Sequence, residues 1–180
     1  MKIEFHSSEK GFRKGLLFLS GRGKMIESWN VTSTGKKIDL ELGFRERAQT
    51  ALVEFDEKDY ELYLTGGDAP DLIEQLDPKV KWVVVASSMG GYFASLLPEK
   101  LLLGILIIDS PPRLSRTDFK VPVRVHLKVT AEVKPDFDFW DQVTSYNAKS
   151  EVVVHWDASH LIHWDQPGKI RTSIEELLRS

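Results

Sequence analysis

Short apolar segments constrain the fold of this chain more than any other feature. They are rich in β-branched residues, and several are apolar at consecutive rather than alternating positions. A strand has this pattern when helices cover both of its faces, because both rows of its side chains are then buried. The segments are LLFLS at 16–20, ALVEF at 51–55, WVVVA at 82–86, ILIID at 105–109, VPVRVHLKV at 121–129 and VVVH at 152–155.

Helices are predicted between these strands. Asp68 can cap a helix over 69–76, and residues 89–97 can form another that Pro98 ends. The clearest helix follows Pro167, where apolar residues recur at helical spacing: Ile170, Ile174, Leu177 and Leu178. The alternation of strands and helices predicts an α/β fold, with a mostly parallel central sheet and helices on both faces.

Two segments are harder to assign. VTSTGKKIDLELGF at 31–44 could form a hairpin that turns at Thr34–Gly35, and FRERAQ at 44–49 could form a helical turn. YELYL at 60–64 alternates, which fits either an edge strand or a loop.

Composition bounds the class of protein. The 180 residues are enough for a single domain, 1–180, and the net charge of -3 comes without a long run of either sign, so we expect no nucleic-acid partner. The chain has no cysteine, which excludes disulfides, thiolate zinc sites and cysteine nucleophiles. Its longest apolar stretches are far shorter than the roughly 20 residues of a membrane span. We expect a soluble, cytoplasmic protein.

The strand at 82–86 leads into Ala86-Ser87-Ser88-Met89-Gly90-Gly91 and then a predicted helix. This order is typical of a nucleophile elbow, in which the chain reverses sharply at a strained serine and small neighbours let the backbones pass. Ser88 would lie at the apex, at a helix N-terminus that favours negative charge. The same string could instead ease a tight strand-to-helix connection.

A serine nucleophile requires a base, normally a histidine that a carboxylate orients. His160 lies beyond the strand at 152–155 and before the last helix, a position at the same sheet edge as the elbow. The first candidate for the carboxylate is Glu132, in the turn after the strand at 121–129, and the runner-up is Asp109. Third choices are Asp136 and Asp138. His160 could also be an ordinary loop histidine, and Glu132 a solvated turn residue.

The oxyanion of such a reaction requires backbone N–H donors. One would be the N–H of Met89, directly after the nucleophile. The second would come from the loop Ser20-Gly21-Arg22-Gly23, because glycines let the backbone turn its N–H inward. That loop could equally be a plain turn.

Together these motifs resemble the α/β-hydrolase superfamily, in particular its lipase, esterase and carbon-carbon bond hydrolase branch. FLSGRG at 18–23 resembles the HGxG strand ending, ASSMGG at 86–91 resembles GHSMGG, the turn at 131–135 resembles the acid turn, and ASHLIHWDQP at 158–167 resembles the histidine ending. The resemblance implies the roles of these residues: nucleophile Ser88, base His160, acid Glu132, and oxyanion donors Arg22 and Met89.

The sequence departs from the family pattern at several positions. Ala86 replaces the first glycine of the elbow, Ser20 replaces the histidine of HGxG, and Glu132 stands where the family more often has Asp. Family members often insert a lid between the strands that here lie at 105–109 and 121–129, but only residues 110–120 fill that gap. We therefore expect no lid and a shallow site.

A shallow site favours a small-molecule acyl substrate, an ester or thioester of a short or exposed acyl group, cleaved through an acyl-enzyme. Pro111, Pro112, Leu114 and Trp29 could wall the pocket or could simply pack beneath loops. A catalytically silent ligand- or protein-binding member of the same fold is the alternative function. The sequence does not indicate the oligomeric state.

The histidines near the C-terminus invite a metal hypothesis. They alternate with carboxylates: His155, Asp157, His160, His163 and Asp165. The chain has no HExxH pattern, and a strand followed by a loop directs these side chains to different sides. We expect neither a metal nor a cofactor.

Overall fold

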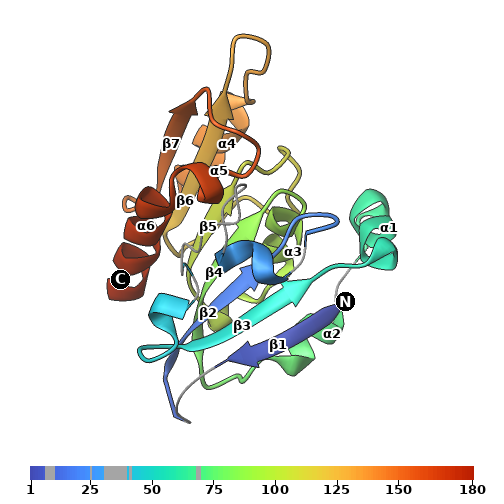
Figure 1. Ribbon diagram of the computed structural model, residues 1–180, viewed down its shortest axis with the longest axis vertical. Coiled ribbons are helices and arrows are strands. Elements are labelled where there is room, and N and C mark those ends of the chain that lie inside the picture. Colours follow the sequence, from blue (N-terminus) through green and yellow to red (C-terminus); the bar gives the residue numbers. More distant parts are fainter. Residues whose placement is uncertain (7–10, 25, 31–39, 41, 68–69) are drawn as a thin grey trace.

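The computed structural model describes residues 1–6, 11–24, 26–30, 40, 42–67 and 70–180. Its core is a seven-stranded sheet in the order β1-β3-β2-β4-β5-β6-β7 (Figure 1). Only β1 runs antiparallel, against β3, and the other neighbours pair in parallel. The strands are β1 Lys2–His6, β2 Lys14–Leu19, β3 Gln49–Glu54, β4 Lys81–Ser87, β5 Leu102–Ile108, β6 Val123–Val129 and β7 Glu151–Trp156. The six apolar segments predicted as strands are confirmed as β2 to β7, and β1 is an addition.

The α-helices are α1 Glu57–Thr65, α2 Pro70–Gln75, α3 Gly90–Leu96, α4 Phe137–Thr144, α5 Ile162–Asp165 and α6 Pro167–Arg179. Short 3₁₀ helices span Ile26–Asn30, Leu42–Phe44 and Glu99–Leu101. The structure therefore confirms three predicted helices as α2, α3 and α6. The expected hairpin turn at 34–35 and the cap at 68 lie outside the described residues.

Helix α1 overturns the interpretation of residues 60–64 as an edge strand or loop. Its N-terminus is a capping box, in which Asp56 Oδ1 accepts the Asp59 N–H at 3.1 Å and Asp59 Oδ2 accepts the Asp56 N–H at 2.8 Å. Each carboxylate satisfies a backbone donor that would otherwise lack a partner at a helix start. These local bonds outweigh the weak alternation of YELYL.

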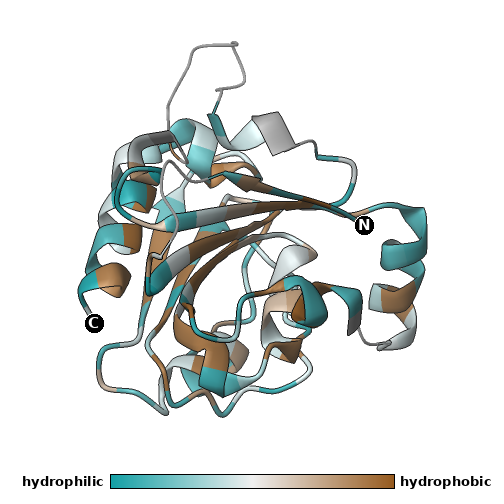
Figure 2. Cartoon of the chain, turned by 90° about the horizontal axis from the view of Figure 1, so that it is seen from below, coloured by the Kyte–Doolittle hydropathy of each residue, from teal (hydrophilic) through white to brown (hydrophobic). Residues whose placement is uncertain are grey.

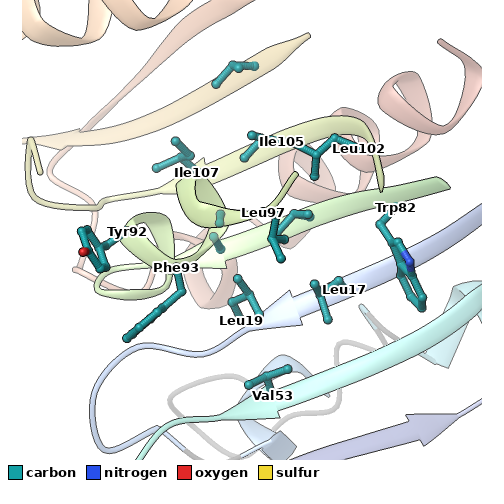
Figure 3. Close-up of a cluster of buried hydrophobic side chains, with 14 of the residues drawn as sticks. Leu17, Leu19, Val53, Trp82, Tyr92, Phe93, Leu97, Leu102, Ile105 and Ile107 are labelled. Atoms are coloured by element: carbon teal, nitrogen blue, oxygen red, sulfur yellow. The ribbon is translucent and has the colours of Figure 1, made fainter. Parts of the chain in front are cut away.

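Both faces of the sheet are buried, which explains the consecutive apolar positions. Leu17 and Leu19 of β2 point to the side of the sheet that α3 covers with Phe93 (Figure 3). Leu16 and Phe18 of the same strand point to the opposite side, where they share a cluster with apolar residues of α6: Ile170, Ile174 and Leu177. The central strands are correspondingly hydrophobic along their length (Figure 2).

The link from β5 to β6 determines how open the sheet edge is. Residues 109–122 are all described, and they contain no helix or strand. A lid domain is therefore absent from this link, as the sequence predicted. None of the helices in the described part of the chain is long and apolar enough to cross a membrane.

Candidate active site

Ser88 occupies a sharp turn between β4 and α3. Its φ of 52° lies in the left-handed region, which costs a non-glycine residue roughly 1–3 kcal/mol. The surrounding backbone holds this conformation: Ser88 N–H donates to Ile108 O at 2.9 Å, and Gly91 N–H donates to Ser88 O at 3.0 Å. The predicted strand, strained serine and helix are thus all present.

Close packing explains why glycine occupies two positions near Ser88, one at the turn and one in the loop after β2. A Cβ on Gly90 would lie 2.6 Å from the Leu19 carbonyl oxygen, and a Cβ on Gly21 would lie 3.0 Å from the Ser88 Cβ. No larger residue fits at Gly90 without moving the backbone of β2. The loop after β2 therefore lies directly against Ser88.

The two backbone donors that the sequence predicted are available. Among the described residues, neither the Met89 N–H nor the Arg22 N–H has a hydrogen-bond acceptor. The Arg22 side chain is bound to α1 instead, with its guanidinium 3.2 Å from Glu57 and 3.7 Å from the centre of the Tyr60 ring. The Arg22 side chain is therefore held by α1, while its backbone N–H stays without an acceptor among the described residues.

His160 binds the carboxylate of Asp109. The distance from His160 Nδ1 to Asp109 Oδ2 is 2.6 Å. Asp109 has a φ of 44°, and the N–H of Lys128 donates to its Oδ1 at 3.3 Å. The Asp109 side chain is only 15% exposed, whereas the His160 side chain is 47% exposed. A carboxylate with little solvent exposure thus binds an imidazole that solvent can reach.

Glu132, the first candidate for this carboxylate, does not pair with His160. Its side chain is exposed and has no hydrogen bond or ion pair with the described residues, while its N–H donates to Thr130 Oγ1 at 3.3 Å. In the structure the partner of His160 is therefore the runner-up, Asp109, and not Glu132. The register of β4 and β5 explains the position of Asp109, because the carbonyl of the preceding residue, Ile108, accepts the Ser88 N–H.

The third choices have other positions. Asp136 Oδ1 accepts the Phe139 N–H at 3.0 Å and so caps α4, and Asp138 is exposed in the first turn of that helix. Within the described residues, no hydrogen bond joins Ser88 Oγ to His160, and His160 Nε2 has no partner. The structure brings His160 and Asp109 together and places Ser88 on the neighbouring strand end.

His163 and Trp29 form a buried aromatic pair next to the site. The sequence analysis did not identify this pair. Their ring centroids are 4.6 Å apart, and Trp29 Nε1 donates to Ser20 Oγ at 3.0 Å, directly before the loop with Gly21. Burial, followed by the nearby His160, lowers the pKa of His163 to about 3. Trp29 is fully buried, so it packs in the core and does not wall an open pocket.

A cavity of about 440 Å³ adjoins the His160–Asp109 pair. Pro111 and Pro112 line it, as the sequence suggested, but Leu114 instead packs against the core. A second hollow of about 410 Å³ lies between the end of β7 and α6 and contains neither His160 nor Asp109. The two volumes are similar, so the first cavity is distinguished by the His160–Asp109 pair in its lining.

The C-terminal histidines do not converge on one point. His155 Nε2 lies 2.8 Å from His126 Nδ1, and His126 Nε2 lies 2.9 Å from Ser173 Oγ. Burial and the neighbouring His155 lower the pKa of His126 to about 3. The described residues contain no cluster of three or more histidines and carboxylates that could hold a metal ion.

No protein-family model matches this sequence, and no curated protein matches it. Solved structures do match. An esterase from Thermogutta terrifontis is 14% identical, with a TM-score of 0.67 over 99% of this chain and 92% of that chain. The enol-lactonase from Burkholderia xenovorans LB400 is 11% identical, with a TM-score of 0.70 over 99% and 96%, and MenH from S. aureus is 10% identical, with a TM-score of 0.59 over 98% and 97%. The chain has the α/β-hydrolase fold.

Proposed function

We propose that the protein is a serine hydrolase that cleaves a carboxylic ester or thioester of a small or exposed acyl group. One observation carries the proposal: the strained Ser88 is hydrogen-bonded to the end of the strand whose next residue, Asp109, binds His160. A nucleophile, a base and a carboxylate are the groups that acyl transfer to serine requires. The likeness to esterase structures agrees with this reading.

In the first step, Ser88 Oγ attacks the carbonyl carbon while His160 Nε2 takes its proton. Asp109 holds the opposite ring nitrogen and stabilises the imidazolium. The carbonyl oxygen gains negative charge, which the N–H groups of Met89 and Arg22 stabilise. The intermediate then collapses, the bond to the alcohol or thiol breaks, and His160 gives its proton to the departing atom.

In the second step, water attacks the acyl-serine ester. His160 takes a proton from the water, and the resulting intermediate releases the acid as the proton returns to Ser88 Oγ. Neither step requires a cofactor. Because residues 109–122 form no lid, little apolar surface surrounds the acyl group, which favours short or exposed acyl groups.

The test compares two neighbouring serines. Ser88→Ala should abolish labelling by a fluorophosphonate probe and lower p-nitrophenyl acetate turnover by at least about 10³-fold. Ser87→Ala is the matched control, since Ser87 is buried and its Oγ has no partner among the described residues. It should keep both labelling and turnover. Equal labelling of wild type and Ser88→Ala would refute the proposed nucleophile.

A catalytically silent binding protein is the second candidate. The observation that favours it is the missing hydrogen bond between Ser88 Oγ and His160 within the described residues. Triad hydrogen bonds are often long in free enzymes and shorten when substrate binds, so this observation weighs less than the strained turn. Well-folded protein that neither labels nor turns over esters would support the silent candidate.

A further inference from the structure

Helix α1 contacts both of the segments that carry the proposed oxyanion donors. Arg22 lies in the loop after β2, and its guanidinium carbon is 3.7 Å from the centre of the Tyr60 ring in α1. One nitrogen of the same guanidinium is 3.2 Å from Glu57 Oε2, in the first turn of the helix. Tyr92 of α3 donates its hydroxyl hydrogen to Gly67 O at 3.2 Å, just beyond the end of α1. The helix therefore joins the loop after β2 to α3.

A row of aromatic rings makes this connection continuous. The rings of Tyr60 and Tyr63 have centroids 6.0 Å apart and an interplanar angle of 24°. Tyr63 meets the Tyr92 ring edge to face, with centroids 5.5 Å apart, and both of these tyrosines are buried. The Arg113 guanidinium, from the link after β5, lies 5.1 Å from the centre of the Tyr63 ring. We call the row Arg22, Tyr60, Tyr63 and Tyr92 the aromatic brace.

The Arg22 peptide lies beside the nucleophile at one end of this brace. Gly21, the residue before it, is so close to Ser88 that an added Cβ would lie 3.0 Å from the Ser88 Cβ. Lys24 N–H donates to Gly21 O at 3.2 Å and closes a turn in which Gly23 has a φ of 64°. Among the described residues the Arg22 N–H has no acceptor. The contacts of the Arg22 side chain therefore add a restraint that a hydrogen bond of this N–H does not supply.

Such a restraint matters because an oxyanion donor must be oriented before the negative charge forms. Arg22 has a glycine on each side, and glycine permits many backbone conformations. The Glu57 side chain is 78% exposed, so water and salt screen its ion pair with Arg22. Tyr60 is only partly exposed, and a guanidinium on the face of its ring keeps more of its attraction. The ring is therefore the more important of the two contacts.

We propose that Tyr60 is a positioning residue: its ring holds the Arg22 side chain and thereby orients the Arg22 N–H toward the oxyanion that forms at Ser88. The inference rests on the proposed hydrolase function and adds to it a residue that touches neither the substrate nor the reacting atoms. Through the aromatic brace, α1 keeps the loop after β2 in place against the start of α3.

The kinetic test removes the ring and then restores it. Tyr60→Leu should lower kcat for p-nitrophenyl acetate about fivefold, the size of an exposed cation–π contact. KM should stay unchanged, because acylation and deacylation both pass through an oxyanion and slow together. The loss is smaller than the roughly 10²- to 10³-fold cost of removing a whole donor. Tyr60→Phe keeps the ring face and should keep the wild-type kcat.

Tyr146→Leu is the matched control. It also removes a ring that a cation covers, with Lys120 Nζ 5.1 Å from the ring centre, but this ring lies after the end of α4. Its kcat and KM should equal those of wild type, and urea unfolding compares the stability of the two leucine variants. An equal loss of kcat in both variants, or no loss in Tyr60→Leu, would overturn the proposal.

Arg22→Met breaks the same contact from its other end and keeps the peptide N–H. It should lower kcat at least as much as Tyr60→Leu, because it also removes the ion pair with Glu57. The double variant should lose no more than Arg22→Met alone, since one contact can be removed only once. Losses that multiply in the double variant would show that the two side chains act independently and would overturn the positioning role.

A measurement of the loop itself separates this proposal from the proposed function. Order parameters from ¹⁵N relaxation report the mobility of the amides at 21–23, and they should fall in Tyr60→Leu but not in Tyr146→Leu. If wild type cleaves no ester and these values still fall, the hydrolase is refuted and the restraint of the loop by Tyr60 is retained. If wild type cleaves esters and Tyr60→Leu changes neither kcat nor these values, the positioning role is refuted and the hydrolase is retained.

Discussion

His160 and His163 lie three residues apart on one segment, yet their surroundings are opposite. The His160 side chain is 47% exposed and binds a carboxylate at 2.6 Å. His163 is 1% exposed, and neither of its ring nitrogens has a hydrogen-bond partner among the described residues. Its ring packs against the Trp29 ring instead, tilted by 32°. The same residue type thus occurs once as a solvent-accessible side chain bound to a carboxylate and once as an aromatic core residue.

The difference teaches that the role of a histidine depends on its partner and its exposure. Asp109 orients His160 and can stabilise its protonated form, which a general base needs during turnover. Burial lowers the pKa of His163 to about 3, so this ring is neutral at pH 7 and has no route to a substrate. Spacing along the chain would not separate the two.

Substituting each histidine in turn gives the largest expected effect. His160→Ala should lower kcat for p-nitrophenyl acetate by about 10³-fold or more, because the proposed base is lost. His163→Phe should stay within a few fold of wild type, since phenylalanine keeps the ring that packs on Trp29. Steady-state kinetics on both variants, with circular dichroism as the folding check, measures the contrast. Comparable losses in both variants would contradict it.

Substitution of Asp109, the carboxylate partner of His160, should have the second-largest effect on turnover. Asp109→Asn should lower kcat by about 10²- to 10⁴-fold, because an amide holds the imidazole in the wrong tautomer. Glu132→Gln is the matched control at the exposed turn after β6, and it should leave kcat unchanged. The opposite outcome, with the loss at Glu132, would restore the first sequence-based candidate and remove Asp109 from the mechanism.

Much of the fold could be predicted because it depends on local patterns. A strand covered on both faces is apolar at consecutive positions, and α6 has its apolar residues at helical spacing. The antiparallel β1 was missed because KIEFH is only partly buried at a sheet edge, so its sequence carries little periodicity. Helix α1 was missed because its start depends on a capping box of two aspartates.

The site was predictable only where chain neighbours build it. The turn at Ser88 is formed by adjacent residues, so the small residues around it mark it in the sequence. The choice between Asp109 and Glu132 depends on strand register and on the left-handed backbone of Asp109, which three-dimensional packing sets. The burial of His163 against Trp29 joins residues far apart in the chain, and no local pattern indicates it.

The smallest effect is on stability and follows from the low pKa of His163. Its unfolded-state pKa is the ordinary 6.5, and its folded-state pKa is about 3. Between these values the unfolded chain binds a proton that the folded chain does not, so the free energy of unfolding falls as pH falls, by about 1.4 kcal/mol per pH unit from this group. The contribution is fully present above pH 6.5 and is lost on acidification.

Two substitutions of His163 separate the effect of its titration on stability from the cost of burying its ring nitrogens. His163→Phe and His163→Gln both remove the titrating group, so both should flatten the loss of stability between pH 6 and pH 4 by about 1.4 kcal/mol per unit. Only the phenylalanine should also gain about 1 kcal/mol at pH 7, because it removes buried nitrogens that have no partner. Urea unfolding at several pH values measures both effects. A wild-type slope in both variants would mean that His163 titrates in the folded protein as it does in the unfolded chain, and the contrast with His160 would then rest on geometry alone.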